Sequence, residues 1–132
     1  MRPIPERARL LLPRVDPARL CLGWPIGLRD SALLALLTTD LTVAEIAALP
    51  ADAITVDRGA LRVTVQRGPD AWSLPLRPSA AARVLAWLTE RRIWGTGQPV
   101  FTGIRGPMTS NAIHQILYRY QHPPATRRRR KP

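Results

Sequence analysis

The stretch RDSALLALLTTDLTVAEIAAL, residues 29–49, decides the fold more than any other part of the chain. Its first part is an apolar run that follows Asp30, a residue type that commonly caps a helix N-terminus. Its second part begins at Thr42, and Glu45 stands three residues later, which is the pattern of a capping box. Pro50 then ends the segment. The stretch therefore predicts two consecutive helices, the first of them apolar.

Three runs rich in β-forming residues follow these helices. The runs cover residues 53–56, 61–66 and 71–76, and the turn-forming sequences DRG (57–59) and RGPD (67–70) separate them. The middle run alternates leucine and valine with arginine, threonine and glutamine, so one of its faces is apolar and the other polar. This pattern predicts a three-stranded antiparallel meander with one buried face.

Two further helices complete the predicted α+β fold, a mostly helical single domain with a small β-meander. The first covers residues 79–92, and a loop over residues 95–107 follows it, interrupted by a short buried stretch at residues 100–101. Thr109 then caps a last helix that runs through Tyr120. The residues of these two helices that we expect in the core are Ala82, Leu85, Ala86, Leu88, Ile113, Ile116 and Leu117.

The ends of the chain differ from the middle in composition. Residues 1–20 are rich in proline and arginine and predict an extended leader with at most one helical turn, whereas residues 123–132 form a basic tail with no large apolar residue. Residues 21–122 are the expected domain. The prolines near the N-terminus break a signal-peptide pattern, and no apolar run approaches the roughly 20 residues of a bilayer span. We therefore expect a soluble, cytoplasmic protein that does not contact membranes.

Positive charge is concentrated in the second half of the chain. The sequence has 20 basic and nine acidic residues, a formal net charge of +11. Residues 1–70 carry nine arginines and eight acids, whereas residues 71–132 carry eleven basic residues and one acid, Glu90. A biased genome explains an arginine-rich composition, but it explains the loss of acids after residue 70 less well. Such a one-sided field attracts polyanions, and nucleic acid is the commonest one in a cell.

Four motifs, in order and at matching spacings, resemble the catalytic domain of the tyrosine recombinases, the phage integrase family. RDSALLALL (29–37) is similar to the family's R-D-x-A-L-L-x-L-L helix, and TDLTVAEIAAL (39–49) is similar to its T-G-L-R-x-x-E-L-x-x-L segment. QRGPDAWSLPL (66–76) lies over the family's G-K-G-x-K-x-R-x-V-P-L hairpin, and MTSNAIHQIL (108–117) is similar to its later l-T-x-x-x-i-x-x-i-l helix. The resemblance implies the fold of the first half of that catalytic domain.

The departures from the family pattern fall on its catalytic positions. The family's first catalytic arginine clamps the scissile phosphate, and Thr42, which supplies no positive charge, stands in its place. Asp40 replaces a glycine two residues earlier. The family's hairpin lysine, a general acid, aligns with Arg67, and an arginine holds its proton too tightly for that role.

The family's remaining catalytic residues, a histidine–arginine box and the tyrosine nucleophile, lie further along than the matched motifs. Tyr118 and Tyr120 lie inside the last predicted helix, upstream of the nucleophile's position. We therefore expect no catalytic residues and no phosphodiester chemistry. No cofactor is expected, and no metal site, because the two histidines have no third ligand nearby and the single cysteine is too few for a metal cage.

What the resemblance leaves in place is a DNA-binding surface, since in the family the hairpin lies against the duplex and the late helix enters the major groove. Asn111, His114 and Gln115 share one face of that helix by their spacing, and asparagine and glutamine can each pair bidentately with adenine. Ser110 is a further candidate near the helix start. The candidate phosphate contacts are Arg58, Arg62, Arg67, Arg105 and Arg119, with the tail residues Arg127, Arg128, Arg129, Arg130 and Lys131.

The leading hypothesis is a non-catalytic duplex-DNA binder derived from a tyrosine recombinase, a nucleoid-associated regulator or accessory architectural factor. A second hypothesis is a protein–protein module that docks on a full-length recombinase or on itself. A third takes residues 33–49 as a helix-turn-helix in which Thr42, Val43 and Ala44 face DNA, although no basic residue lies between Asp30 and Arg58. A decayed remnant without a selected function is the last alternative.

Overall fold

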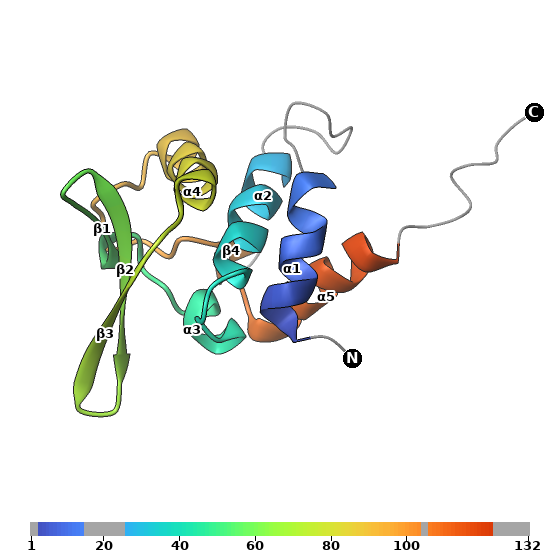
Figure 1. Cartoon of the computed structure of the whole chain (residues 1–132), viewed down its shortest axis with the longest axis horizontal. Helices are drawn as coiled ribbons and strands as arrows, with labels where there is room; N and C mark the ends of the chain where they lie inside the picture. The colour runs from blue at the N-terminus through green and yellow to red at the C-terminus, as the bar shows by residue number, and fades with distance from the viewer. Residues whose placement is uncertain (1–2, 15–25, 104–105, 123–132) are drawn as a thin grey trace, which may run out of the picture.

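The computed structural model describes residues 3–14, 26–103 and 106–122, and Figure 1 shows its elements in chain order. A three-stranded sheet lies at one end of the longest axis, α2 lies near the centre, and α1 and α5 lie toward the other end (Figure 1). The elements are α1 (Ile4–Leu11), η1 (Leu12–Arg14), α2 (Ile26–Leu37), α3 (Val43–Ala47), η2 (Ala51–Ala53), β1 (Ile54–Asp57), β2 (Ala60–Arg67), β3 (Asp70–Pro75), α4 (Pro78–Arg91), β4 (Thr102–Gly103), β5 (Gly106–Pro107) and α5 (Ser110–Gln121).

Helix α2 is the centre of the core. Ten of its twelve residues are buried, because α1, α4, α3 and α5 all pack against it. A helix that is apolar on every side is stable only when it is enclosed in this way. The helix begins at Ile26, so the prediction that Asp30 caps its N-terminus is wrong: Asp30 lies in the second turn and its side chain is buried.

Asp30 and Ser31 are the buried polar residues among those described, and each joins α2 to another helix. The Asp30 carboxylate accepts a hydrogen bond of 2.6 Å from the Tyr120 hydroxyl of α5, and its other oxygen is paired with the guanidinium of Arg29 at 2.9 Å. Ser31 Oγ accepts a hydrogen bond of 2.8 Å from Arg83 of α4. Buried polar groups need such partners, so these bonds fix how α4 and α5 lie against α2.

The N-terminal segment corrects the sequence prediction. Residues 4–11, expected in an extended leader, form the helix α1, which packs on α2 and buries Ala8 and Leu11. Pro5 lies in the first turn of α1, where a proline removes no helical hydrogen bond. The expected boundary near residue 20 and the basic tail at 123–132 lie outside the described residues.

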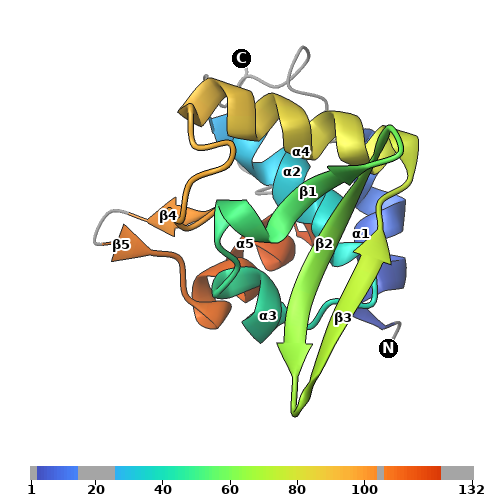
Figure 2. The same ribbon diagram turned by 90° about the vertical axis from the view of Figure 1, so that its left-hand side faces the viewer.

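The sheet confirms the predicted antiparallel meander, with the order β1-β2-β3. In its register Ile54 lies opposite Val63, and Val63 lies opposite Leu74, on the face toward the helices. Arg62 and its cross-strand partner Thr55 point outward. The β1–β2 turn places Arg58 at φ 54° and Gly59 at φ 80°. A two-residue hairpin turn with both residues in the left-handed region matches the twist of the strands. Figure 2 shows the sheet from its outer side.

Helix α4 lies along α2, but the face that it turns toward the core is not the predicted one. Ala82, Leu85 and Ala86 are exposed, and α4 buries Ala80, Val84, Trp87 and Leu88 instead. The indole of Trp87 sets this rotation, because its N–H donates a buried hydrogen bond of 2.7 Å to the carbonyl of Val100 and its ring stacks on Phe101. Only Leu88 of the four predicted core residues of this helix is correct.

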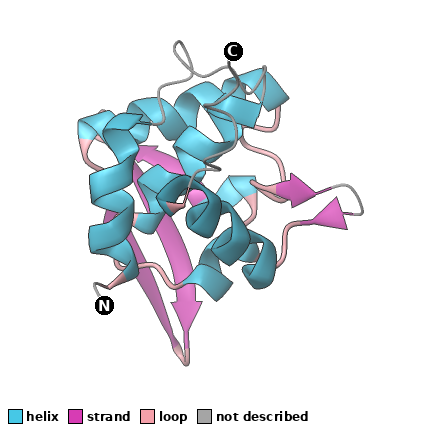
Figure 3. Cartoon of the chain, turned by 90° about the vertical axis from the view of Figure 1, so that its right-hand side faces the viewer, coloured by secondary structure: helices cyan, strands magenta, loops and turns pink. Residues whose placement is uncertain are grey.

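The predicted buried stretch at residues 100–101 and the predicted last helix are confirmed. Val100 and Phe101 are buried, and the short hairpin of β4 and β5 follows them. Figure 3 shows this hairpin projecting beside the helices. Helix α5 starts after Thr109, whose side chain accepts from the Ala112 N–H, and its buried residues are Ile113, Ile116 and Leu117 as expected.

The β2–β3 hairpin extends beyond the body, and a contact with α3 fixes its position. Thr42 and Glu45 form the predicted capping box. The same Glu45 carboxylate accepts two hydrogen bonds of 2.8 Å from Arg67 of β2, and Arg67 also donates to the Asp40 carbonyl at 3.1 Å. The Arg67 guanidinium lies over the Trp72 ring of β3, 5.2 Å from its centre. A bidentate arginine–carboxylate pair fixes geometry as well as charge.

The first prediction concerns the bond between α2 and α5. Replacing Tyr120 with phenylalanine leaves the ring in place but removes a donor to a buried carboxylate, so the free energy of unfolding should fall by about 1.5–3 kcal/mol in urea titrations. Tyr118→Phe is the matched control, because Tyr118 is 61% exposed. Equal changes in the two variants would contradict the assigned role of Tyr120.

The second prediction concerns acid. The hydrogen bonds from Arg67, helped by the Thr42 N–H, lower the pKa of Glu45 from 4.5 to about 2. Because the folded-state pKa is depressed, this pair stabilises the fold fully above pH 4.5 and progressively less as the pH falls toward 2. The wild-type chain should therefore lose more unfolding free energy between pH 5 and pH 3 than Glu45→Gln, which keeps the capping acceptor. A parallel pH dependence of the two proteins would refute this assignment.

Candidate nucleic-acid interface

The exposed face of α5 carries the side chains that the sequence predicts to read DNA. Asn111, His114 and Gln115 are exposed and follow one another at helical spacing, while Ser110 beside them is half-buried. Arg119 continues the same face one turn later and is exposed. The opposite face packs in the core, so α5 presents its polar side chains from a fixed support. The structure therefore brings together the predicted residues of this helix.

Tyr118 and His122 extend this face, and sequence reasoning did not select them. The side chain of Tyr118 is 61% exposed, and the His122 ring lies against it with the ring centres 4.3 Å apart. The signal was present in the sequence, since Tyr118 follows His114 by four residues and His122 follows Tyr118 by four, which keeps them on one helix face. We call the set Asn111, His114, Gln115, Tyr118, Arg119 and His122 the α5 stripe.

The middle of the α5 stripe is hollowed. An open hollow of about 550 Å³ is lined by His114, Gln115, Tyr118 and Arg119. An amide and two ring nitrogens supply donors and acceptors there, the guanidinium adds a positive charge, and the phenol ring adds an apolar surface. This mixture suits the edge of a polar, negatively charged partner better than an apolar ligand.

The C-terminal turn of α5 is held by two tertiary contacts. Tyr120 donates to Asp30, as described above, and the Gln121 side chain accepts a hydrogen bond of 3.2 Å from Arg7 of α1. Burial, the bond to Asp30 and its negative charge raise the pKa of the Tyr120 hydroxyl above its usual range. This phenol is therefore held protonated and turned away from the stripe.

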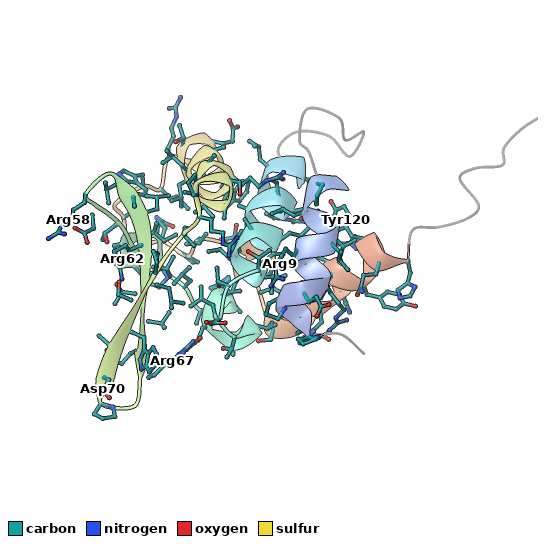
Figure 4. All side chains as sticks on the ribbon, in the orientation of Figure 1. Arg9, Arg58, Arg62, Arg67, Asp70 and Tyr120 are labelled. Carbon is teal, nitrogen blue, oxygen red and sulfur yellow. The ribbon has the colours of Figure 1, made fainter. Side chains whose placement is uncertain are left out.

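The predicted arginines of the sheet lie far from the α5 stripe. Figure 4 shows Arg58 and Arg62 at the sheet end of the molecule, and Tyr120 of α5 toward the other end. Arg58 is exposed at the tip of the β1–β2 turn. Arg62 is half-buried and donates to the side chain and the carbonyl of Ser73, at 2.9 and 3.2 Å. The structure therefore separates the predicted phosphate contacts into two groups.

The charge of Arg67 is already compensated within the protein. Its guanidinium is shared between Glu45 and the Asp40 carbonyl, so a phosphate would have to compete with these acceptors. The hydrogen bonds to Glu45 raise the pKa of Arg67 further, which makes proton donation by this residue still less favourable. Arg105 and the tail residues 127–131 lie outside the described residues.

Three exposed arginines that the sequence analysis did not select have no partner among the described residues. Arg9 lies on α1, Arg77 immediately precedes α4, and Arg92 ends α4 in the left-handed conformation at φ 57°. Each lies outside the four motifs of the family resemblance, so the motifs give no reason to select it. The sequence around an arginine also does not show whether its guanidinium is paired in the fold.

Thr42, which the resemblance aligns with the family's first catalytic arginine, takes part in a helix cap. The Thr42 hydroxyl accepts the N–H of Glu45 at 3.1 Å, and its own N–H donates to the Glu45 carboxylate at 2.9 Å. The Thr42 side chain thus caps the N-terminus of α3. The helix-turn-helix alternative gains little from this geometry, because α3 has five residues and the charged neighbours Asp40 and Glu45 would repel a phosphate.

Metal and membrane sites do not appear in the part of the chain that the structure describes. No group of three or more metal-ligating side chains gathers in residues 3–14, 26–103 or 106–122. None of the helices in these ranges is long and apolar enough to span a bilayer. The α5 stripe and the exposed arginines are therefore the surface features on which a function can be argued.

Comparison with known proteins supports the fold by structure rather than by sequence. The sequence matches no protein-family profile and no curated protein. The structure is similar to that of the XerH site-specific recombinase bound to its difH substrate as a pre-cleavage complex, with a TM-score of 0.63 and 16% sequence identity. The match covers 96% of this chain and 37% of the recombinase chain, so this chain spans little more than a third of that protein. The predicted resemblance is confirmed at this level: the chain has a tyrosine recombinase-like α+β fold, corresponding to part of a recombinase catalytic domain.

Proposed function

We propose that this chain is a non-catalytic duplex-DNA-binding protein, a regulator or accessory architectural factor that reads DNA with α5. The observation that carries the proposal is the α5 stripe, a continuous row of polar, aromatic and basic side chains on a helix whose other face is fixed in the core. The recombinase of similar fold was solved bound to its DNA substrate, which agrees with this proposal.

The dimensions of α5 suit a major groove. Its twelve residues give a length of about 18 Å, and the groove of B-DNA is about 12 Å wide and admits one helix. Asn111 and Gln115 stand one turn apart on the exposed face, so their amides can reach the edges of neighbouring base pairs. Arg119, another turn along, is placed to contact a phosphate at the groove edge.

Three positions support the non-catalytic part of the proposal. Thr42 stands where the resemblance expects a phosphate-clamping arginine, and its hydroxyl is used by the capping box. Arg67 stands where it expects a general acid, and it is paired with Glu45. The Tyr120 hydroxyl donates a hydrogen bond to Asp30 and is held protonated, away from the α5 stripe. Each of these side chains already has a partner within the protein, which supports a role without transesterification.

A protein–protein role is the second candidate, and exposed apolar side chains favour it. Leu10 of α1, Ile26 of α2 and Leu85 of α4 are 56, 44 and 44% exposed, and their helices are neighbours. Such a surface suits docking on a full-length recombinase or on a second copy. Sedimentation equilibrium without DNA tests this directly, since self-association should weaken when Leu85 is changed to serine.

The third prediction tests base reading. Binding of the intact chain to genomic and random duplexes, followed by fluorescence anisotropy, should show a preferred sequence. Asn111→Ala and Gln115→Ala should each reduce the preference by about 1–3 kcal/mol, because a bidentate amide–adenine pair contributes that much discrimination. Gln98→Ala, an exposed amide in the loop after α4, is the matched control and should leave the preference intact.

Two results of this titration would count against the proposal. The first is affinity that is equal for all duplexes. The second is affinity that disappears when the five basic residues 127–131 are changed to serine, since binding would then come from the tail alone. Arg119→Ala should instead weaken all sequences equally and lower the salt dependence by about one counterion.

The fourth prediction tests the absence of chemistry. Incubation with end-labelled duplexes carrying the preferred sequence, intact or nicked, should give no covalent protein–DNA adduct on denaturing gels and no new DNA fragments. An adduct that is lost in Tyr118→Phe or Tyr120→Phe would overturn the non-catalytic assignment while leaving DNA binding in place.

A further inference from the structure

The outer face of the sheet is a second surface with the chemistry of a phosphate-backbone contact. Residues that alternate outward along the three strands are exposed except for half-buried Arg62, and the part of the chain that the structure describes covers none of them. Most of their side chains are polar or basic, the types that donate hydrogen bonds to phosphate oxygens, and Ala60, Ala71 and Pro75 alternate outward beside them. We call the following set the outer sheet face: Thr55, Asp57, Arg58, Arg62, Thr64, Gln66, Ser73 and Arg77.

Three arginines lie at the end of this face nearest the β1–β2 turn. Arg58 lies at the tip of the β1–β2 turn and has no partner among the described residues (Figure 4). The backbone continues extended from β3 through Leu76, which is buried and bonded to the Leu61 carbonyl, so alternation directs Arg77 to the outer side. Arg62 lies flat against β3 through Ser73, and its Nη1 has no acceptor among the described residues.

The balance of charge on this face favours an anion. Asp57 is the one acid on the outer sheet face as defined above, against its three arginines. Arg62 is oriented before any ligand arrives, which reduces the entropy lost when it binds a phosphate. Several donors spread along one sheet surface suit the regularly spaced phosphates of a duplex rather than a single small anion.

This face points away from the α5 stripe. The inner face of the sheet packs toward α4 and η2, and α5 packs against α1, α2 and α3 on the other side of the core. Figure 1 places the sheet at one end of the longest axis, and Figure 2, viewed from that end, shows the sheet in front of the helices. A straight duplex lying along α5 therefore cannot also lie on the outer sheet face.

From these placements we propose that the outer sheet face binds a second DNA duplex, so that one molecule bridges two DNA segments. The inference rests on the proposed function, because it assigns the first duplex to the α5 stripe. In this arrangement the α5 stripe recognises the sequence of one duplex, and the outer sheet face contacts the phosphates of the other duplex independently of sequence.

The fifth prediction tests this bridging with the intact chain. A biotinylated duplex of the preferred sequence on beads should retain the protein, and the retained protein should hold a labelled random duplex. Arg58→Gly with Arg77→Ala should leave the first duplex bound and reduce retention of the second. By the counterion-release slope, each lost phosphate contact costs on the order of tenfold in affinity at 0.1 M salt.

The matched control is Arg92→Gly with Arg9→Ala. It also removes two unpartnered arginines, one of them from a left-handed position where glycine relieves strain, but neither residue lies on the sheet. This control should keep the second duplex. Light scattering of the complex should give one protein molecule for two duplexes.

The outcomes separate the two proposals. Failure of the wild-type chain to bind the first duplex would overturn the proposed function. Binding of the first duplex without the second would overturn bridging alone. Bridging that survives in the Arg58→Gly, Arg77→Ala variant, or a complex with two protein molecules, would assign the second contact to the tail or to self-association and would also overturn the role of the outer sheet face.

Discussion

The burial of α2 is the constraint on which the rest of the structure depends. A helix with apolar residues on every side has to be enclosed, and four other helices provide this enclosure. Apolar packing alone would leave the surrounding helices free to slide or rotate. Asp30 and Ser31 remove that freedom, because the buried side chain of each accepts a hydrogen bond from a specific residue of another helix, Tyr120 of α5 and Arg83 of α4. The orientation of the α5 stripe thus depends on one polar residue of α2, Asp30, which accepts the hydrogen bond of Tyr120.

The same bonds explain why the polar side of α5 can act as a recognition surface. Its N-terminal end is capped by Thr109 and packs near α3, while its C-terminal end is tied to α2 and α1 through Tyr120 and Gln121. A helix held at both ends presents its exposed side chains in one arrangement, so base contacts lose little entropy on binding. Sites built on such elements are more precise than sites on loops.

Local signals in the sequence were sufficient for some elements and not for others. The meander, the capping box of α3 and the buried face of α5 depend on neighbours within a few residues, and all three were predicted correctly. The phase of α4 depends on the bond from Trp87 to Val100, which joins residues 13 positions apart. The helix α1 was missed because its prolines suggested an extended leader, although Pro5 is compatible with a helix start. Within the candidate site, the α5 residues followed from spacing, whereas the pairing of Arg67 with Glu45 joins residues 22 positions apart and has no local signature.

Arginines of identical charge have different uses in this molecule, and their partners decide which. Arg67 lies at a position that the family resemblance assigns to catalysis, yet its guanidinium is the clamp between the β2–β3 hairpin and α3. With threonine at position 42, Glu45 has no arginine on its own helix to pair with, and Arg67 supplies the compensating charge across the hairpin. Arg58 and Arg77, by contrast, project from the outer sheet face and have no partner within the described ranges. A charge that is compensated inside the protein stabilises the fold, and a charge that is not compensated remains available for an external anion. Compensated and uncompensated arginines are therefore compatible within one fold, because they lie on opposite faces of the same sheet.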